Sequence, residues 1–280
     1  MRECVIIRCL SVGARERQMR QILTRQFGAD SVYFVCDSDC EESAHLVSLP
    51  RYLASSGFKV NIDRLGWRCG DHCFYAILSK SRDHDYYWLI ENDVYLDEPA
   101  VGKLRLESAQ RCEDLLIHGF AAGASGKTWD KHYRHYYDEP AYGGLFPVVR
   151  LSHKAVAYLG QERLRLAQRF DGTRYYPNDE SFVCSRLHNN GFHCGALQAT
   201  TEGYFNLTRK LEKNVAPGML HHPVSTCPRE IVNKDKRRLR KNFYRLRWAR
   251  VYRFLRASYR ENNGDGRLLA RYIAALLFLS

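Results

Sequence analysis

The stretch that most constrains this chain is an apolar, aromatic-rich run that ends abruptly at two carboxylates. Residues 86–90 read Tyr-Tyr-Trp-Leu-Ile, then come Glu91, Asn92 and Asp93, and apolar residues resume after them. Such a run is typical of a strand buried in a parallel sheet. Alternation along an extended segment places Glu91 and Asp93 on the same face, within reach of one cation. Carboxylates are the ligands that Mg²⁺ and Mn²⁺ prefer, so the run predicts a divalent-metal site.

Taken alone, an acidic pair with one residue between is more typical of a strand end with solvated acids. The surrounding pattern favours the metal site, because strands and helices alternate through the first hundred residues. Strands are predicted at 4–12, 31–36 and 57–62, and helices at 15–27, 46–56 and 72–79, with Gly28 and Asp71 as caps. Alternation of this kind predicts parallel βαβ units. Ligands of such folds bind at the carboxyl ends of the strands, where Asp37 and Asp93 both fall.

The second half of the chain is less regular. Residues 119–140 are rich in Gly, His and Tyr and predict a long loop, and residues 141–151 predict a glycine turn that enters a strand. Asp179 and Glu180 begin a predicted helix. Acids are favourable in the first turn of any helix, so helix capping is the alternative to a catalytic role for this pair.

Composition excludes several classes of protein. Hydrophobic residues make up 45% of the 280 residues, no run approaches the length of a membrane-spanning helix, and the N-terminus reads as a first strand rather than a signal peptide. The ten cysteines are scattered, which indicates reduced thiols and a cytoplasmic protein. The sequence has no P-loop, no GxGxxG after a strand and no GxSxG elbow, which argues against NTPase, dinucleotide-binding and serine-hydrolase functions.

The net charge is concentrated in one segment. Residues 229–260 hold thirteen Lys or Arg and two acids, a net +11 out of +12 for the whole chain. On a helical wheel from Leu239 to Arg260, five arginines fall within one arc and the aromatic residues fall on the other side. The five are Arg245, Arg250, Arg253, Arg256 and Arg260. This pattern predicts that residues 229–280 form a basic amphipathic helical extension that binds an anionic membrane surface, with the protein peripheral on the inner face of the membrane. The alternative is a helix docked on the rest of the protein with its charges solvated.

Several motifs occur in an order that resembles the GT-A glycosyltransferases, over roughly residues 4–224. The motifs are the acid Asp37, the loop Trp67-Arg68-Cys69-Gly70, the Glu91-Asn92-Asp93 strand end, Gly143-Gly144 before a strand, the Asn178-Asp179-Glu180 helix start and a late histidine. The resemblance implies an α/β fold, a Rossmann-type βαβ sandwich with a mostly parallel central sheet. It also implies a catalytic domain at 1–228, with a nucleotide-binding half at 1–100 and an acceptor-binding half at 101–228.

The activity that the resemblance implies is transfer of a sugar from a nucleotide-diphosphate donor to a hydroxyl of a glycan or lipid-linked acceptor, with Mn²⁺ or Mg²⁺ as cofactor. This sequence has Glu91 where the family's DxD motif usually has Asp, which places more weight on Asp93 as the metal ligand. The implied site comprises Asp93, Glu91 and either His222 or His221 at the metal, Asp37, Arg68 and Asn92 at the donor, and Asp179, or else Glu180, as the base. A free carboxylate as base suits inversion at the anomeric carbon, and a membrane-presented acceptor suits bacterial surface polysaccharide assembly.

Two other functions fit parts of the sequence. The basic segment suits a nucleic-acid-binding protein, because phosphate neutralisation dominates such binding. The rest of the chain is nearly neutral, however, and nucleic-acid binding does not explain why the carboxylates lie at predicted strand ends. A metal-dependent nucleotidyl or phosphoryl transferase is the second alternative, since it uses the same kind of acidic metal site.

Overall fold

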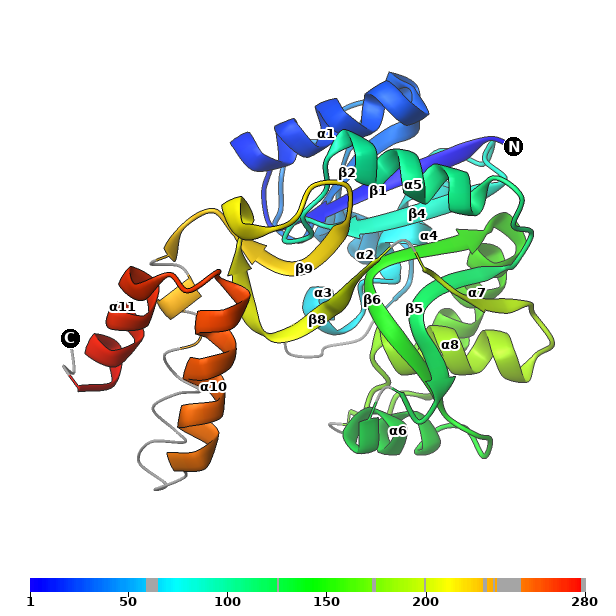
Figure 1. The fold of residues 1–280 in the computed structure, drawn as a ribbon. Helices are drawn as coiled ribbons and strands as arrows, with labels where there is room; N and C mark the ends of the chain where they lie inside the picture. Colours follow the sequence, from blue (N-terminus) through cyan, green and yellow to red (C-terminus); the bar gives the residue numbers. More distant parts are fainter. Residues whose placement is uncertain are drawn as a thin grey trace. The chain divides into compact units, whose positions relative to one another are not determined.

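The chain folds into two compact units in the computed structural model, which describes residues 1–58, 65–124, 126–172, 175–198, 200–228, 231–233, 235 and 248–277. Unit 1 consists of Met1–Asn92 and Val101–Gln198, and unit 2 of Asp93–Ala100 and Ala199–Ser280 (Figure 1). The predicted divisions at residues 100 and 228 stay predictions.

A seven-stranded sheet forms the centre of unit 1. Its strands are β1 (Glu3–Cys9), β2 (Val32–Cys36), β3 (Leu46–Ser48), β4 (Tyr86–Glu91), β5 (Leu115–Ala122), β6 (Tyr142–Ser152) and β7 (Cys194–Ala196). The strand order is β3-β2-β1-β4-β6-β5-β7, and β6 runs antiparallel to both of its neighbours while the other pairs are parallel. The predicted α/β fold with a mostly parallel central sheet is therefore confirmed.

Helices cover both faces of this sheet. They are α1 (Ala14–Phe27), α2 (Leu49–Ser55), α3 (Leu65–Arg68), α4 (His72–Lys80), α5 (Glu98–Ser108, whose first residues belong to unit 2), α6 (Gly126–Arg134), α7 (His153–Arg169) and α8 (Asp179–Asn189), with a 3-10 turn at Ala29–Ser31. Cys4 and Ile6 of β1 share a core cluster with residues of α4, α7 and α8. Val5 and Ile7 alternate to the opposite face and are equally buried, and α1 packs against β1. Burial on both faces explains why these strands read as continuous apolar runs.

A buried ion pair joins the helices on one face. Arg163 of α7 donates to the Asp71 carboxylate at 2.7 and 3.0 Å, and both side chains are fully buried. The predicted helix at 72–79 is confirmed, but Asp71 makes no capping hydrogen bond, because its carboxylate accepts from Arg163 and from the Tyr75 hydroxyl instead. Ser152 does cap α7, accepting from the backbone N–H of Ala155.

Two predicted segments are wrong. Residues 46–56 are not one helix, because Leu46–Ser48 pairs with β2 as strand β3 before α2 begins. Residues 119–140 are not a long loop: the end of β5 and helix α6 occupy most of that stretch. The polar, half-exposed end of β5 explains the error, since it lacks the apolar run that marks a buried strand. Part of the predicted strand at 57–62 lies outside the described residues.

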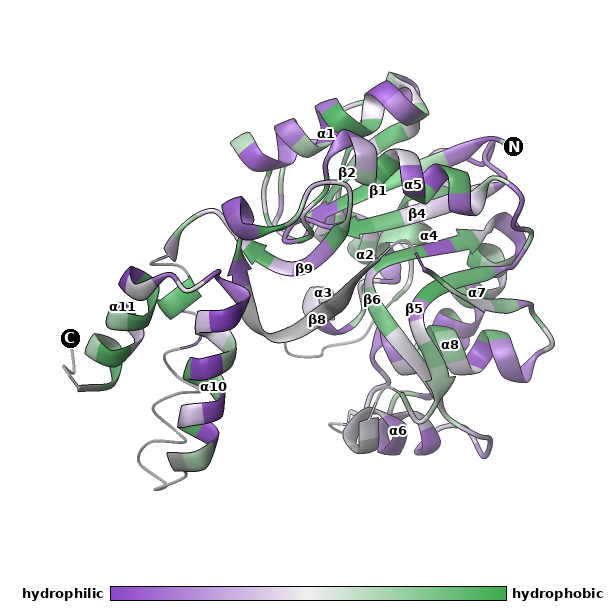
Figure 2. Cartoon of the chain, in the orientation of Figure 1, coloured by the Kyte–Doolittle hydropathy of each residue, from purple (hydrophilic) through white to green (hydrophobic). Residues whose placement is uncertain are grey.

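The described part of unit 2 includes a pair of parallel strands, a 3-10 turn and two helices near the C-terminus. These are β8 (Thr200–Leu211), the turn at Glu212–Asn214, β9 (Leu220–Ser225), α10 (Trp248–Glu261) and α11 (Gly266–Leu277). Figure 2 shows hydrophilic and hydrophobic residues alternating along α10, as the predicted amphipathic extension requires. The apolar side is used inside the protein, however. Val251 belongs to a core cluster of unit 2, and Phe254 and Leu255 pack against that cluster. The other members of the cluster are Leu211, Ile231, Val232, Leu268, Tyr272 and Leu276.

The outer side of α10 remains basic and aromatic. Arg250, Arg253, Arg256 and Arg260 are exposed, together with Tyr252. Among the described residues, no helix is both long and apolar enough to cross a membrane.

Candidate active site

Arg8 is the centre of a charged cluster at the carboxyl edge of the unit 1 sheet. It is 5% exposed and is the register partner of Glu91 on the adjacent strand β4. Its guanidinium donates to Glu91 Oε1 at 2.7 Å and to Asp37 Oδ2 at 3.1 Å. Burial lowers the pKa of Arg8, but the carboxylates of Glu91 and Asp37 outweigh burial and raise it overall, so the guanidinium stays charged. Asp37 and Glu91, both predicted site residues, are therefore bridged by the guanidinium of Arg8.

Two glycines bring the loop around α3 close to this cluster. The Gly66 carbonyl accepts a hydrogen bond from Arg8, and a Cβ on Gly66 would lie 3.0 Å from Asp37 Cγ. A Cβ on Gly70 would lie 2.6 Å from Arg8 Nη1 and 2.9 Å from Asp179 Oδ2. Only glycine fits at Gly70 without displacing a charged group. Glycine at these two positions thus lets the Trp67-to-Gly70 loop pack directly against the charged side chains at the strand ends.

Asp179 lies beside this cluster, at the start of α8. Its carboxylate accepts from the backbone N–H of Gly70 at 2.9 Å and of Glu180 at 2.8 Å, and it is 5% exposed. Burial and the neighbouring Glu180 raise the pKa of Asp179 well above its usual range, although Arg8 opposes the change. Asn178, rather than either acid, caps the helix by accepting from the Ser181 N–H. Both acids nevertheless lie in the first turn of α8, where acids are favourable, so helix stabilisation remains the alternative to a catalytic role, and Glu180 is partly exposed.

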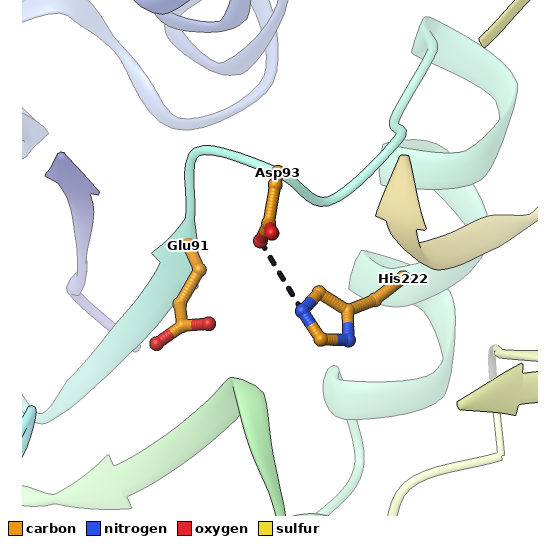
Figure 3. A group of neighbouring side chains, drawn as sticks. All are labelled: Glu91, Asp93 and His222. Carbon is orange, nitrogen blue, oxygen red and sulfur yellow. Dashed lines mark ion pairs between the residues drawn. The ribbon is translucent and has the colours of Figure 1, made fainter. Parts of the chain in front are cut away.

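Asp93 and His222 form the second charged group. Asp93 Oδ1 lies 3.2 Å from His222 Nε2, and the Asp93 carbonyl accepts from the N–H of Val224 on the same strand as the histidine. Glu91, two residues earlier in the chain, completes a set of three side chains whose potential ligand atoms lie within 4.8 Å of one another (Figure 3). The predicted strand geometry is wrong in detail: β4 ends at Glu91, and Asp93 lies in a turn. The carboxylates converge because of that turn.

His222 is the member of the histidine pair that faces Asp93 at ion-pair distance. His221 is the preceding residue of β9, and its backbone pairs with Tyr95 in an isolated bridge. Burial lowers the pKa of His221 to about 4, so its imidazole is neutral near pH 7.

The potential ligand atoms of Glu91, Asp93 and His222 fit a divalent cation. Two carboxylates and one imidazole are ligands that Mn²⁺ accepts readily and that Mg²⁺ accepts through its carboxylates. Glu91 is already bound by Arg8, whereas Asp93 faces the imidazole of His222. The three side chains therefore fit one ion, with Asp93 and His222 the better placed pair.

Two predicted donor-binding residues have contacts within unit 1. The Asn92 side chain donates to Glu16 of α1 at 2.7 Å, and its carbonyl accepts from Arg15 at 2.6 Å. Arg68 donates to the Tyr176 carbonyl at 2.6 Å and lies over the Trp129 ring. These contacts position the side chains, and a role for either residue at the donor stays a prediction.

Sequence reasoning missed Arg8. A signal for it existed: Arg8 is a single charge in the otherwise apolar run from Cys4 to Cys9, inside the predicted buried strand. A buried charge is rarely tolerated unless it is paired, so that arginine implied acids on the neighbouring strands.

Comparison with known proteins gives similarity in structure only. The sequence matches neither a protein-family profile nor a curated protein. Mouse xyloside xylosyltransferase 1 is similar at 10% identity, covering 80% of this chain and 98% of that one, with a TM-score of 0.38. An active-site variant of LgtC is similar at 11% identity, covering 79% and 86%, with a TM-score of 0.41. Mannose-1-phosphate geranyltransferase from Thermus thermophilus is similar at 8% identity, covering 75% and 84%, with a TM-score of 0.38. The similar structures include glycosyltransferases, but at such low scores the function rests on this chain's own residues.

Proposed function

We propose that this protein is a metal-dependent glycosyltransferase that moves a sugar from a nucleotide-diphosphate donor to a hydroxyl of a glycan or lipid-linked acceptor. The observation that carries the proposal is the convergence of Glu91, Asp93 and His222 at the end of a central parallel strand (Figure 3). The carboxyl edge of such a sheet is where α/β proteins bind nucleotide ligands.

In this proposal Asp93 and His222 hold Mn²⁺ or Mg²⁺, and Glu91 supports them from its ion pair with Arg8. Held by these residues, a divalent ion would supply Lewis-acid compensation of the negative charge on the leaving diphosphate. Asp37 follows β2 and accepts a hydrogen bond from Arg8. In this proposal it also accepts hydrogen bonds from the donor's base or ribose. Arg68 and Asn92 contribute to donor binding from the flanking loop and turn.

Asp179 is the proposed base that takes the proton from the acceptor hydroxyl, and Glu180 is the alternative. Burial and the neighbouring Glu180 raise the pKa of Asp179, and a carboxylate with a raised pKa is a stronger proton acceptor. Gly70 and Glu180 hold its two oxygens in place through backbone N–H groups. A base of this kind, with no second nucleophilic carboxylate needed, supports a reaction that inverts the anomeric carbon.

The exposed arginines of α10 support a peripheral role at an anionic membrane. Because the apolar side of α10 is packed in unit 2, we propose that membrane binding is electrostatic and does not insert the helix. An acceptor presented on the cytoplasmic face of a membrane, as in bacterial surface polysaccharide assembly, fits this arrangement.

A hydrolysis and binding screen tests the proposal. Thermal stability is measured with Mn²⁺ and each of a panel of nucleotide sugars, with duplex DNA as the comparison, and donor hydrolysis is followed with and without EDTA. We expect stabilisation and hydrolysis with one class of nucleoside diphosphate sugar, both lost in EDTA. Stabilisation by DNA alone, or hydrolysis that is equal in EDTA, contradicts the proposal.

A further inference from the structure

A continuous series of rings lies on unit 1 beside the charged cluster. Successive ring centroids are 6.4, 5.1, 5.5, 5.0 and 4.8 Å apart. We call this series the aromatic track, and it comprises Trp67, Trp129, His132, Tyr175, His135 and Tyr136.

The track begins at an exposed tryptophan next to the proposed active site. Trp67 is 64% exposed and follows Gly66, whose carbonyl accepts from Arg8. A single exposed tryptophan is ordinary, but Trp67 contacts the Trp129 ring, and contiguous aromatic surface of this kind is typical of an interaction site. Arg68, the next residue, places its guanidinium 5.4 Å from the Trp129 ring centroid.

The rings are held in place before any ligand binds. Arg68 donates to the Tyr176 carbonyl while it lies over Trp129, and the His132 ring stands edge-on to both Trp129 and Tyr175. Farther along, the Tyr136 hydroxyl donates to Asp171 at 3.0 Å, and His135 lies 3.2 Å from the same carboxylate. Rigid aromatic faces lose little conformational entropy on binding, so this arrangement suits recognition.

A hollow adjoins the far part of the track. Its volume is about 530 Å³, within the range of small-molecule sites. Its lining residues are Asp130, Lys131, Arg134, His135 and Tyr175. The Lys131 ammonium lies over the Tyr175 ring, 5.1 Å from its centroid, so charged groups and rings lie together in the hollow.

We infer that the aromatic track binds an oligosaccharide, as the acceptor subsites that lead to the proposed active site. The face of an aromatic ring carries partial negative charge, and the C–H face of a pyranose carries partial positive charge, so the two stack. The hydroxyls at the sugar's rim suit the polar groups of the hollow. Because several rings lie in series, the track fits an oligosaccharide better than a monosaccharide. The identity of the ligand as an acceptor rests on the proposed function.

Oligosaccharide binding is tested without metal or nucleotide, so that its outcome is separate from transfer. Tryptophan fluorescence and saturation-transfer NMR are recorded with a panel of neutral and acidic di- to hexasaccharides. We expect affinity to rise with chain length, to fall about tenfold or more in Trp67→Ala and to fall less in Trp67→Phe, because truncation of a contacting tryptophan removes a dominant contact. Tyr252→Ala, an equally exposed aromatic residue of unit 2, is the matched control and should bind normally.

Each outcome decides one proposal. Asp93→Ala should keep oligosaccharide binding while it loses transfer; binding without any transfer activity by the wild type contradicts the proposed function and leaves the subsite standing. Binding that is unchanged in Trp67→Ala, or no binding by the folded wild type at millimolar concentrations of every oligosaccharide, overturns the subsite. A change in oligomeric state in Trp67→Ala, seen by light scattering, assigns the exposed ring to a protein contact and also overturns it.

Discussion

Glu91 and Asp93 are carboxylates separated by one residue, yet their surroundings differ in kind. Glu91 ends a strand of unit 1 and is paired at 2.7 Å with Arg8, a cation that the fold itself supplies. Asp93 lies in the following turn, in unit 2, and faces His222 at 3.2 Å. One acid is thus neutralised by a permanent charge. The other is matched with a side chain that is itself a common metal ligand.

The difference separates a supporting role from a binding role. A carboxylate held by a buried guanidinium gains little from an added cation, because its charge is already compensated. A carboxylate beside an imidazole gains more, since one metal ion binds both groups. The comparison predicts unequal effects for substitutions that look equivalent in the sequence.

The largest effect is expected at Asp93. Asp93→Ala should abolish transfer and metal-dependent donor binding, because it removes the better placed of the two carboxylate ligands. Glu91→Ala should reduce transfer by only about 10- to 100-fold, the range typical of groups that orient a metal ligand. Calorimetric titration with Mn²⁺ and steady-state rates of both variants measure the two effects.

Circular dichroism and urea unfolding of the two variants are the controls, because Asp93 lies in a turn whereas Glu91→Ala also removes one partner of the buried Arg8. Equal losses at the two positions would remove the distinction between them. Near-normal transfer by Asp93→Ala would show that the metal site lies elsewhere.

The next effect is expected at the proposed base. Asp179→Asn keeps the size of the side chain but cannot take a proton, so turnover should fall by roughly 10²–10⁴-fold with donor affinity little changed. Because the pKa of Asp179 is raised, the wild-type rate should rise with pH through a value above the ordinary aspartate pKa of about 3.9. The variant should lose that limb of the pH–rate profile.

Stability gives an independent readout of the same group. A carboxyl whose pKa is raised by the fold stabilises the protein below its unfolded pKa, and this contribution is lost as pH rises through the folded pKa. Denaturant unfolding of Asp179→Asn should therefore depend less on pH above about 4 than that of the wild type. If Glu180→Gln shows the loss of turnover and Asp179→Asn does not, Glu180 is the base.

Arg8 is expected to matter for both folding and activity. Arg8→Met leaves Glu91 and Asp37 adjacent without their cation, and breaking a buried pair in this way destabilises proteins by about 3–5 kcal/mol. Arg163→Met is the matched comparison, since Arg163 is buried against Asp71 in the interior. Both variants should lose stability in urea, but only Arg8→Met should alter the metal affinity of the folded protein. An unchanged metal affinity in Arg8→Met would mean that the Arg8 cluster is purely structural.

The strands that carry the acids were predictable, and the groups that join them were not. The apolar runs before Asp37 and Glu91 mark buried parallel strands, and parallel strands bring their carboxyl ends to one edge. The choice between His221 and His222 depends on the register of β9 in unit 2, which adjacent histidines do not encode. Asp93 faces His222 because it lies in a turn, at a position where the sequence pattern predicted a strand. Helix α6 and its part of the aromatic track were missed because Gly, His and Tyr residues have weak helical propensity and resemble a loop.

The smallest effects are expected from single arginine substitutions on α10, each of which removes one positive charge. Deleting the extension would expose the core of unit 2, because Val251, Leu268 and Tyr272 pack there, so single substitutions are the sharper test. Each basic residue near an anionic surface contributes about 1 kcal/mol, so Arg253→Gln or Arg256→Gln should weaken binding to phosphatidylserine vesicles by about fivefold. Arg82→Gln, which changes an exposed arginine of unit 1, is the control and should leave vesicle binding unchanged.

Co-sedimentation with the vesicles should also weaken with added salt, because salt screens the attraction between the charges. Equal binding to neutral and anionic vesicles would contradict an electrostatic membrane surface, and binding to neither would exclude one.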